Sequence, residues 1–446
     1  MKLLIFGSKC HNYSQNKYLS TIITGRTVMT KKSDTPIISV MHPVCCGLDV
    51  HKNIISACLI TLNPLGSPQY EVREFPTFTD SLFLLRDWLT DNNCPTVAME
   101  STSVYWRPVH NILEGHLDVV LVNARHIKNV PGRKTDTEDS RWLANLLRHG
   151  LVKGSFIPAK EVRQWRDLTT LRKNYTQTLG DYKRRVHKLF ETANIKISSV
   201  VTDLFGVTGR NLISLLCDED ADLSLENIEK CAKGSLGSKS AELHRSIQGF
   251  FEDHHRFQLK LLMDTIEATE RNIKSVTARL ARLMRPHQEV LDRLDEVYGI
   301  NTVAGQSVLS HIGFTLEEFG NEAAFCSWAG LCPGNNESAG KRKSGRSPVR
   351  NHPFKTVMVE IAWSAIKKRD SYYKDKYYRI KYRRGAKKAV VAVAHSIAKG
   401  IYHIIKYGES FEDLGKGYLS GKNQEKKINR LKKQAAQLGY DLVASA

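Results

Sequence analysis

The stretch VCCGLDVHKNIISACLITL, residues 44–62, decides how the first part of this chain folds. Its two halves, VCCGLDV and NIISACLITL, are apolar and rich in β-branched residues, and a short polar step, His51-Lys52, separates them. Two such runs joined by a few polar residues are typical of a β-hairpin. Asp49 lies inside the first run, where a charged side chain costs free energy unless it binds a metal or another partner. The stretch therefore predicts a sheet that carries a functional acid.

Downstream of this hairpin, strand and helix patterns alternate as far as Gly150. The segments that follow are YEVREFP (strand), DSLFLLRDWL (helix), PTVAME (strand), VYWRPVHNILEG (helix), LDVVLVN (strand) and DTEDSRWLANLLRHG (helix). The resulting order, three strands, helix, strand, helix, strand, helix, is the ribonuclease-H-like layout of a mixed sheet with flanking helices. We therefore predict an α/β domain of this class over residues 43–158.

Four acids of this domain can hold divalent metal ions. Asp49 and Glu100 lie on the first and fourth strands, which are neighbours in the predicted sheet, and Asp136 and Asp139 share one helix face at spacing i, i+3. Oxygen ligands with room for waters favour Mg²⁺, for which Mn²⁺ can substitute. Two such ions about 4 Å apart can stabilise the attacking and leaving oxygens of a phosphodiester transfer.

Each acid also has a simpler explanation. Asp136 can cap its helix, and Asp139 can favour the positive end of the helix dipole. Glu100 can be an ordinary residue at a strand end. Asp49 is the hardest to explain without a function, because it interrupts an apolar strand.

The middle of the chain is helical in pattern. Residues 159–195 and 241–285 are charged, have sustained helical periodicity and contain few breakers, whereas residues 200–238 hold several glycines and serines. We predict a helical or coiled-coil assembly region over 159–288, with a plain helical linker as the alternative.

The remaining chain predicts a mostly α domain over 289–410. Residues 290–313, VLDRLDEVYGINTVAGQSVLSHIG, resemble a helix-hairpin-helix segment, which offers backbone N–H groups to DNA phosphates. A Gly/Ser/Lys loop, NNESAGKRKSGRSPVRNH, comes next, followed by helices over about 353–369 and 386–407. Residues 411–446 predict a polar terminal helix or tail. At the other end, residues 1–42 predict a disordered or non-native extension.

The charge of the chain predicts a polyanionic partner. Lys and Arg outnumber Asp and Glu by 66 to 46, which gives a net charge of +20. Such a surplus favours nucleic acid, because neutralising phosphates releases condensed counterions. A basic protein of membrane surfaces is the alternative, but no amphipathic basic helix with a clean apolar face stands out, and no apolar run reaches about 18 residues. The nine cysteines include no C-x-x-C pair, which disfavours a disulfide framework or zinc site and fits a reducing cytosol.

The basic surplus is concentrated late in the chain. Residues 338–388 hold 17 Lys or Arg against Glu360, Asp370 and Asp375. Five tyrosines are interleaved with these cations: Tyr372, Tyr373, Tyr377, Tyr378 and Tyr382. Rings that stack on bases and cations that meet phosphates suit nucleic acid, and a solvated helical face is the alternative.

Four segments carry the most specific patterns: GLDVHK, AMESTSVYW, LVNARHIKNVPGRKTDTEDSRWLANLLRHG and AGLCPGNNESAGKRKSGR. They resemble the transposases of the IS110 type, including its IS1111 branch. The GRKTDTEDS and AGLCPG…SAGK parts are specific, and their occurrence in this order is stronger than either part alone. The resemblance covers roughly residues 44–160 and 289–407.

The resemblance implies two parts of one chemistry. The first is a RuvC-type domain whose Asp-Glu-Asp-Asp set falls on the four acids Asp49, Glu100, Asp136 and Asp139. After a coiled coil, a second, transposase domain supplies a nucleophilic serine, which falls on Ser338 of ESAGK.

Two features of the chain depart from the family's pattern: Ser140 stands where alanine is more usual, and the acidic Glu337 precedes Ser338. In the loop of Ser338, Ser344 and Ser347 are alternative nucleophiles. The cations of this loop are predicted to contact nucleic acid: Lys341, Arg342, Lys343 and Arg346.

The resemblance also implies how the protein works. It would be the transposase of a bacterial or archaeal insertion element, cytoplasmic and associated with the nucleoid, which recombines double-stranded DNA through a serine–DNA covalent intermediate. An element-encoded noncoding RNA would guide it, and subunits of a dimer or tetramer would share the site. The alternatives are a Holliday-junction-type endonuclease that uses water as nucleophile, and a non-catalytic nucleic-acid-binding protein.

Overall fold

The computed structural model describes residues 39–101, 103–123, 139–334, 336–338, 341–345 and 352–437. The chain divides into two compact units, Met1–Ser155 and Phe156–Ala446. Each unit has its own arrangement of strands and helices and is described separately.

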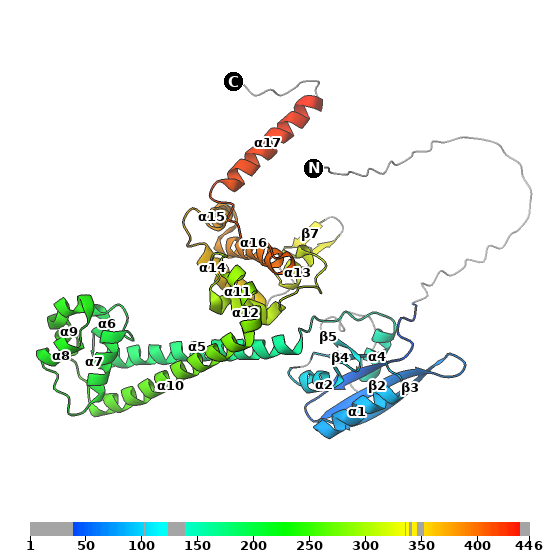
Figure 1. The fold of residues 1–446 in the computed structure, drawn as a ribbon, viewed down its shortest axis with the longest axis horizontal. Helices are drawn as coiled ribbons and strands as arrows, with labels where there is room; N and C mark the ends of the chain where they lie inside the picture. Colours follow the sequence, from blue (N-terminus) through cyan, green and yellow to red (C-terminus); the bar gives the residue numbers. More distant parts are fainter. Residues whose placement is uncertain are drawn as a thin grey trace, which may run out of the picture. The chain divides into compact units, whose positions relative to one another are not determined.

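A mixed five-stranded sheet organises the first unit (Figure 1). Its strands are β1 (Cys45–Val50), β2 (Ile54–Leu62), β3 (Pro68–Pro76), β4 (Thr96–Glu100) and β5 (Asp118–Val122). They lie in the order β3-β2-β1-β4-β5, with β1–β2 and β2–β3 antiparallel and β1–β4 and β4–β5 parallel. The predicted hairpin is therefore confirmed, and so is the prediction that the first and fourth strands are neighbours.

The helix α4 (Asp139–Arg148) lies directly on one face of this sheet. A Cβ atom on Gly47 of β1 would come within 2.2 Å of the carbonyl oxygen of Ser140 and 2.4 Å of the backbone nitrogen of Ala144. No side chain fits between the two backbones at this point, so the glycine allows the close approach. The neighbouring residues of the sheet pack against the apolar side of α4, with Leu143 and Leu147 in the shared core.

The opposite face of the sheet is covered by α1 (Thr79–Asp91) and α2 (Trp106–Leu113), which pack on each other. Phe75 of β3 lies opposite Ile55 of β2 and contacts Trp88 of α1, with 5.5 Å between the ring centroids. Because side chains alternate along a strand, Ile55 points away from the face that carries α4. The sheet is thus covered on both faces, as the sequence pattern predicts.

Two long helices, α5 (Lys160–Thr192) and α10 (Asp253–Met284), run antiparallel and side by side in the second unit (Figure 1). Their far end carries a small lobe made of α6 (Ile197–Val200), α7 (Val207–Cys217), α8 (Leu225–Cys231), the 3₁₀ helix η2 (Gly234–Lys239) and α9 (Ser240–Ser246). The helix-periodic stretch 241–285 is divided into two helices, because α9 ends before a break at Gly249. A Cβ there would lie 2.4 Å from the Ala193 carbonyl oxygen, so the chain turns against the end of α5.

The near end of the pair belongs to a second helical core. It contains η3 (Arg285–His287), α11 (Gln288–Asp295), α12 (Thr302–Ile312), α13 (Glu322–Trp328), α14 (Pro353–Ala365), α15 (Tyr372–Arg384) and α16 (Ala386–Tyr407), followed by α17 (Tyr418–Gln437). The sequence did not predict α15, whose charged residues hide its helical periodicity. Ser371 begins this helix by accepting a hydrogen bond from the backbone N–H of Lys374, at 3.2 Å.

The described cysteines form no disulfide, and burial raises the pKa of the Cys45 thiol to about 12 and that of Cys58 to about 11. These thiols therefore stay protonated near neutral pH and pack as small apolar groups. Within the described ranges, no helix is both long enough and apolar enough to span a bilayer.

Candidate active site

Asp49 and Glu100 lie on the same face of the sheet, at the carboxyl ends of two parallel neighbours. Gly47 of β1 pairs with Ala98 of β4, and Gly47 faces α4. Asp49 lies two residues after Gly47, and Glu100 lies two residues after Ala98. Because side chains alternate between the two faces of a strand, both acids point to the face that carries α4. The fold brings two of the predicted acids to adjacent strand ends.

Asp139 begins the helix that lies on this face, and a pair of hydroxyls connects it with the strand of Asp49. Ser56 of β2 is the register partner of Asp49. The Ser56 Oγ lies 3.1 Å from the Oγ of Ser140, the residue after Asp139. Ser140 is 3% exposed, so this contact is a buried one at the start of α4. Asp139 therefore begins α4 beside the strand segment that holds Asp49.

His51 is a neighbour of Asp49 that sequence reasoning missed. Its Nε2 lies 3.0 Å from Asp49 Oδ2, and its side chain is 62% exposed, against 19% for Asp49. The two residues are spaced i, i+2 at a strand end, which places both side chains on one face. The DVH pattern was therefore available as a signal. His51 can orient the carboxylate through this contact.

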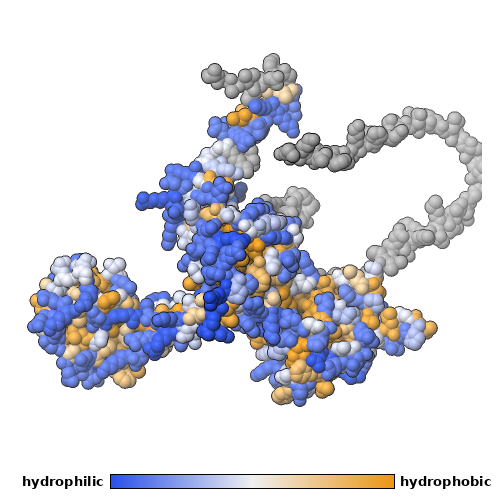
Figure 2. Space-filling view, viewed as in Figure 1, coloured by the Kyte–Doolittle hydropathy of each residue, from blue (hydrophilic) through white to orange (hydrophobic). Residues whose placement is uncertain are grey.

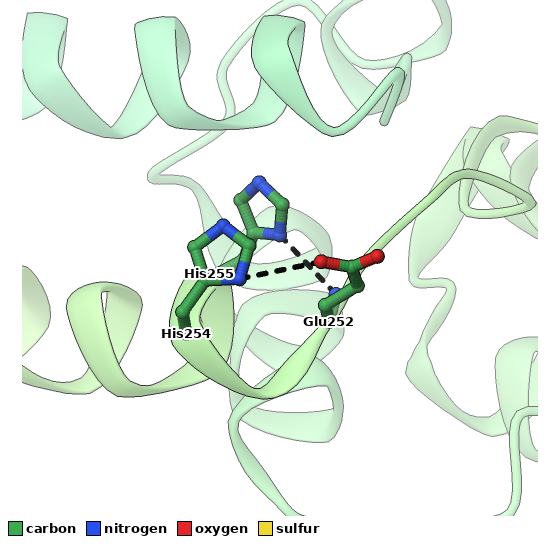
Figure 3. Close-up of side chains that lie close together, drawn as sticks. All are labelled: Glu252, His254 and His255. Atoms are coloured by element: carbon green, nitrogen blue, oxygen red, sulfur yellow. Dashed lines mark hydrogen bonds and ion pairs between the residues drawn. The ribbon is translucent and has the colours of Figure 1, made fainter.

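The structure brings these acids to one face but not into a single ligand shell. Among the described residues, a group of three potential ligands whose donor atoms all lie within 4.8 Å occurs elsewhere, at Glu252, His254 and His255 (Figure 3). Asp49, Glu100 and Asp139 do not form such a group in the described part of the chain. Asp136, the fourth predicted acid, lies outside the described residues.

The hydrogen bonds of the Glu252 group show that it caps a helix. Glu252 and His255 form a capping box at the start of α10, in which His255 Nδ1 accepts the backbone N–H of Glu252 at 3.2 Å. In a neutral ring this leaves the proton on Nε2, so neither nitrogen of His255 offers a free lone pair to a metal. His254 Nδ1 lies 3.4 Å from Glu252 Oε2, and both side chains are exposed. The sheet face remains the better candidate for a metal centre.

Ser338 lies in a short β-hairpin, not in the loop that the sequence predicts. The strands β6 (Asn336–Ser338) and β7 (Lys341–Ser344) are antiparallel, and Ser338 pairs with Lys341. The residues between the paired positions, Ala339 and Gly340, lie outside the described residues. The predicted contacts Lys341, Arg342 and Lys343 are on β7, as is Ser344, whereas Arg346 and Ser347 lie outside the described residues.

The two ends of the segment that carries this hairpin meet. Trp328 ends α13 before the hairpin, His352 precedes α14 after it, and their ring centroids are 4.5 Å apart. Burial, followed by the positive charges of Arg166 and Lys355, lowers the pKa of His352 to about 4. His352 is therefore neutral near pH 7, and the base of the hairpin has a positive potential, which suits an approaching phosphate.

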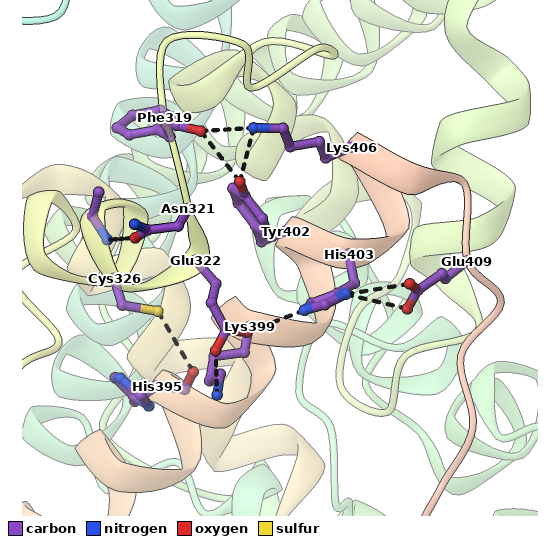
Figure 4. A network of polar contacts seen from close by, with 11 residues as sticks. Phe319, Asn321, Glu322, Cys326, His395, Lys399, Tyr402, His403, Lys406 and Glu409 are labelled. Atoms are coloured by element: carbon purple, nitrogen blue, oxygen red, sulfur yellow. Dashed lines mark hydrogen bonds and ion pairs between the residues drawn. The ribbon is translucent and has the colours of Figure 1, made fainter. Parts of the chain in front are cut away.

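A polar network fixes α13, from which the chain enters the hairpin (Figure 4). Glu322, in the first turn of α13, accepts a hydrogen bond from Lys399 Nζ at 2.6 Å and lies 3.1 Å from His403 Nε2, both on α16. The Lys399 ammonium, followed by the contact with His403, lowers the pKa of Glu322. Lys406 also donates to the carbonyl oxygen of Phe319, at 2.8 Å. The hairpin therefore starts from a helix held rigidly on α16.

The turn between α11 and α12 is also held by the core. A Cβ on Gly299, which has φ +90°, would lie 2.5 Å from the Ile361 carbonyl oxygen of α14. Asn301 caps α12 by accepting the backbone N–H of Ala304 at 2.9 Å. One of the N–H groups at this helix start is therefore satisfied within the chain.

Comparisons with known proteins agree with this geometry. A family model for the DEDD transposase domain of IS110 elements, described as a transposase, matches residues 46–195. A second model, described as transposase IS116/IS110/IS902 family, matches residues 291–379. Together the two matched segments span more than half of the chain. The comparison with curated proteins found no match.

Proposed function

Because this chain belongs to the IS110-type transposases and is thus a DNA transposase of an insertion element, we propose that it recombines DNA with two groups, the acids of the sheet and Ser338. The observation that carries the proposal is the placement of Asp49 and Glu100 at adjacent strand ends, on the face where α4 begins with Asp139. In this proposal the sheet domain is of the RuvC (ribonuclease-H-like) kind, and its strand order supports that assignment.

The matched DEDD domain suggests dependence on a divalent metal, and the donor chemistry of the sheet face fits one. Asp49, Glu100 and Asp139, together with Asp136, would hold it through carboxylate oxygens, which favours Mg²⁺ over softer metals. When bound, such ions supply stabilisation of negative charge on phosphate oxygens. Within the chain itself, His51 orients the Asp49 carboxylate through the contact at 3.0 Å.

Ser338 is the proposed nucleophile. Its Oγ forms a bond to the phosphorus of a DNA phosphodiester as the hydroxyl proton leaves, and the bond from phosphorus to one sugar oxygen breaks, with a proton going to that oxygen. The cations paired across and along the hairpin, Lys341, Arg342 and Lys343, with Arg346 beyond it, would hold the phosphate. The neutral His352 and the positive base of the hairpin support an anion there.

The partners follow from the same family assignment. Double-stranded DNA of the element ends and target is the substrate. We propose that a noncoding RNA encoded by the element guides the reaction. We further propose that the antiparallel α5–α10 pair serves assembly, as a coiled coil in a dimer or tetramer whose subunits share one site. The boundaries near residues 158, 288 and 410 would then separate catalytic, assembly and serine-bearing regions.

The test is the covalent protein–DNA adduct. Wild-type protein incubated with a donor DNA, its RNA and Mg²⁺ should give an adduct that survives denaturing electrophoresis. Ser338→Ala should abolish the adduct, whereas Ser344→Ala and Ser347→Ala should retain it. An adduct that persists in Ser338→Ala but vanishes in either control would move the nucleophile to that serine. Cleaved ends that never carry protein would instead indicate a water-dependent endonuclease of the Holliday-junction type.

A further inference from the structure

Three large aromatic side chains on α14 and α15 are exposed. Trp363 is 44% exposed, Tyr378 39% and Tyr382 83%. By contrast Tyr373 and Tyr377, which the sequence presents as members of the same tyrosine-rich run, are each 5% exposed and belong to the helical core. The structure thus separates tyrosines that stabilise the fold from rings that are free to meet a partner.

The exposed rings form one row across the two helices. The Trp363 ring contacts Tyr377 with a centroid distance of 5.7 Å, Tyr377 contacts Tyr378 at 5.3 Å, and Tyr378 contacts Tyr382 at 6.3 Å. Tyr377 is therefore the buried member that holds the exposed rings in place from below. We call Trp363, Tyr378 and Tyr382 the aromatic row.

One cation of α15 lies against this row. Lys381 Nζ lies 5.4 Å from the ring centroid of Tyr378, a cation–π contact. The helix α15 carries one acid, Asp375, and six cations: Lys374, Lys376, Arg379, Lys381, Arg383 and Arg384. Within the described part of the chain, none of these cations forms an ion pair with a carboxylate. In Figure 2 the surface over α15 is accordingly mostly hydrophilic.

We propose that the aromatic row binds unpaired nucleotides of DNA, with the cations of α15 on the phosphates. A single strand offers two kinds of group to such a surface. Its unstacked bases can stack on the exposed rings, and its phosphates can bind the cations that have no carboxylate partner. In a duplex the bases already stack on each other, so the rings gain little there. Cutting and rejoining DNA exposes unpaired ends. The inference therefore rests on the proposed recombination of DNA, but it does not depend on which residues catalyse that reaction.

The experiment is a binding titration of the full chain with a labelled single-stranded DNA, the same sequence as duplex, and the same sequence as RNA. Tyr382→Ala and Trp363→Ala should each weaken single-stranded DNA binding by about five- to a hundredfold. Tyr382→Phe keeps the ring and should bind as the wild type does. Tyr407→Ala removes an exposed tyrosine of α16, 59% exposed, and should also leave binding unchanged.

Duplex affinity should change less than twofold in all four variants. An equal loss on duplex and single strand would overturn the proposal, as would a loss confined to RNA or the absence of any loss. Circular dichroism controls for folding, and Tyr382→Ala is the safer variant because its ring is largely outside the core. Adduct formation by Ser338 is measured separately, so a failed binding prediction leaves the proposed chemistry standing and a missing adduct leaves the aromatic row standing.

Discussion

The two proposed halves of the chemistry are built very differently. The acids of the sheet sit on β1, β4 and α4, where strand register and a backbone contact through Gly47 determine which way each side chain points. Ser338 sits on a two-stranded hairpin that projects between α13 and α14 and is braced at its base by Trp328 and His352. A metal centre needs several ligands held together, whereas a nucleophile needs one atom that can reach its substrate. The rigid scaffold carries the first and the hairpin the second.

The largest effect expected is on the rigid half. Asp49→Asn removes a carboxylate charge without changing the size of the side chain, and recombination should fall at least about a hundredfold, as when a group acting on the transition state is removed. DNA binding should be retained. Asp118→Asn, at the amino end of β5, is the matched control and should recombine normally. Recombination by Asp49→Asn at the wild-type rate would remove the sheet from the chemistry.

The second prediction concerns the close contact between Gly47 of β1 and the backbone of α4. In Gly47→Ala the new Cβ would meet the backbone of α4 at 2.2 Å, so the helix must move, at a cost of about 1–3 kcal/mol. Gly154→Ala is the control, because its Cβ would meet Val120 Cγ1 at an ordinary 3.5 Å. Thermal unfolding and limited proteolysis of the first unit measure the difference. Equal stability of the two variants would show that α4 does not depend on this contact.

The helical core next to the hairpin should be sensitive to pH through His311 of α12, whose ring lies 6.1 Å from that of Phe354 in α14. Burial, then Arg166, lowers the pKa of His311 to about 3, whereas an unfolded histidine titrates near 6.5. Between these values the unfolded state binds the extra proton, so stability is present above about pH 6.5 and is lost as the pH falls. We expect His311→Leu to reduce the loss of stability between pH 7 and 4.5 by about 2–3 kcal/mol. Calorimetry at the two pH values measures this loss.

His116→Leu, which replaces an exposed histidine of the first unit, serves as the control for that experiment. The pH dependence of its unfolding should match that of the wild type. A pH dependence in His311→Leu identical to the wild type would show that His311 is not held neutral by burial in the native state.

The smallest effect expected concerns Ser140. Its hydroxyl and that of Ser56 satisfy each other at 3.1 Å, so Ser140→Ala or Ser56→Ala alone leaves one partly buried hydroxyl unpaired, at about 1 kcal/mol. The double variant should cost less than the sum of the two single ones. Denaturant unfolding of the four proteins gives this coupling. Strict additivity would mean that the contact does not stabilise the start of α4.

Much of the sheet could be predicted because its signals are local. The apolar runs around Asp49 predicted the hairpin. The order of strands and helices along the chain predicted that the strand of Glu100 lies beside the strand of Asp49. The hidden parts depend on tertiary context. The β6–β7 hairpin is too short and too charged to show the alternation of a strand. The many cations of α15 hide the apolar periodicity of a helix. The contact between His51 and Asp49 can be predicted only when the face of the strand is known. The Ser140 departure from the family's pattern is now explained by Ser56, while nothing in the described residues explains Glu337.

The pair of long helices has a consequence for how the chain is made. The start of α5 gives Val162 and Trp165 to the same core as Leu280 and Met284, which end α10, whereas the far lobe closes on residues near one another in sequence. During synthesis, α5, the lobe and α10 must therefore all be made before Trp165 can contact its partners in the core. Local contacts form fast and distant ones slowly. Within the second unit, the lobe should therefore fold before the serine-bearing helical core, which can close only once translation has delivered α16.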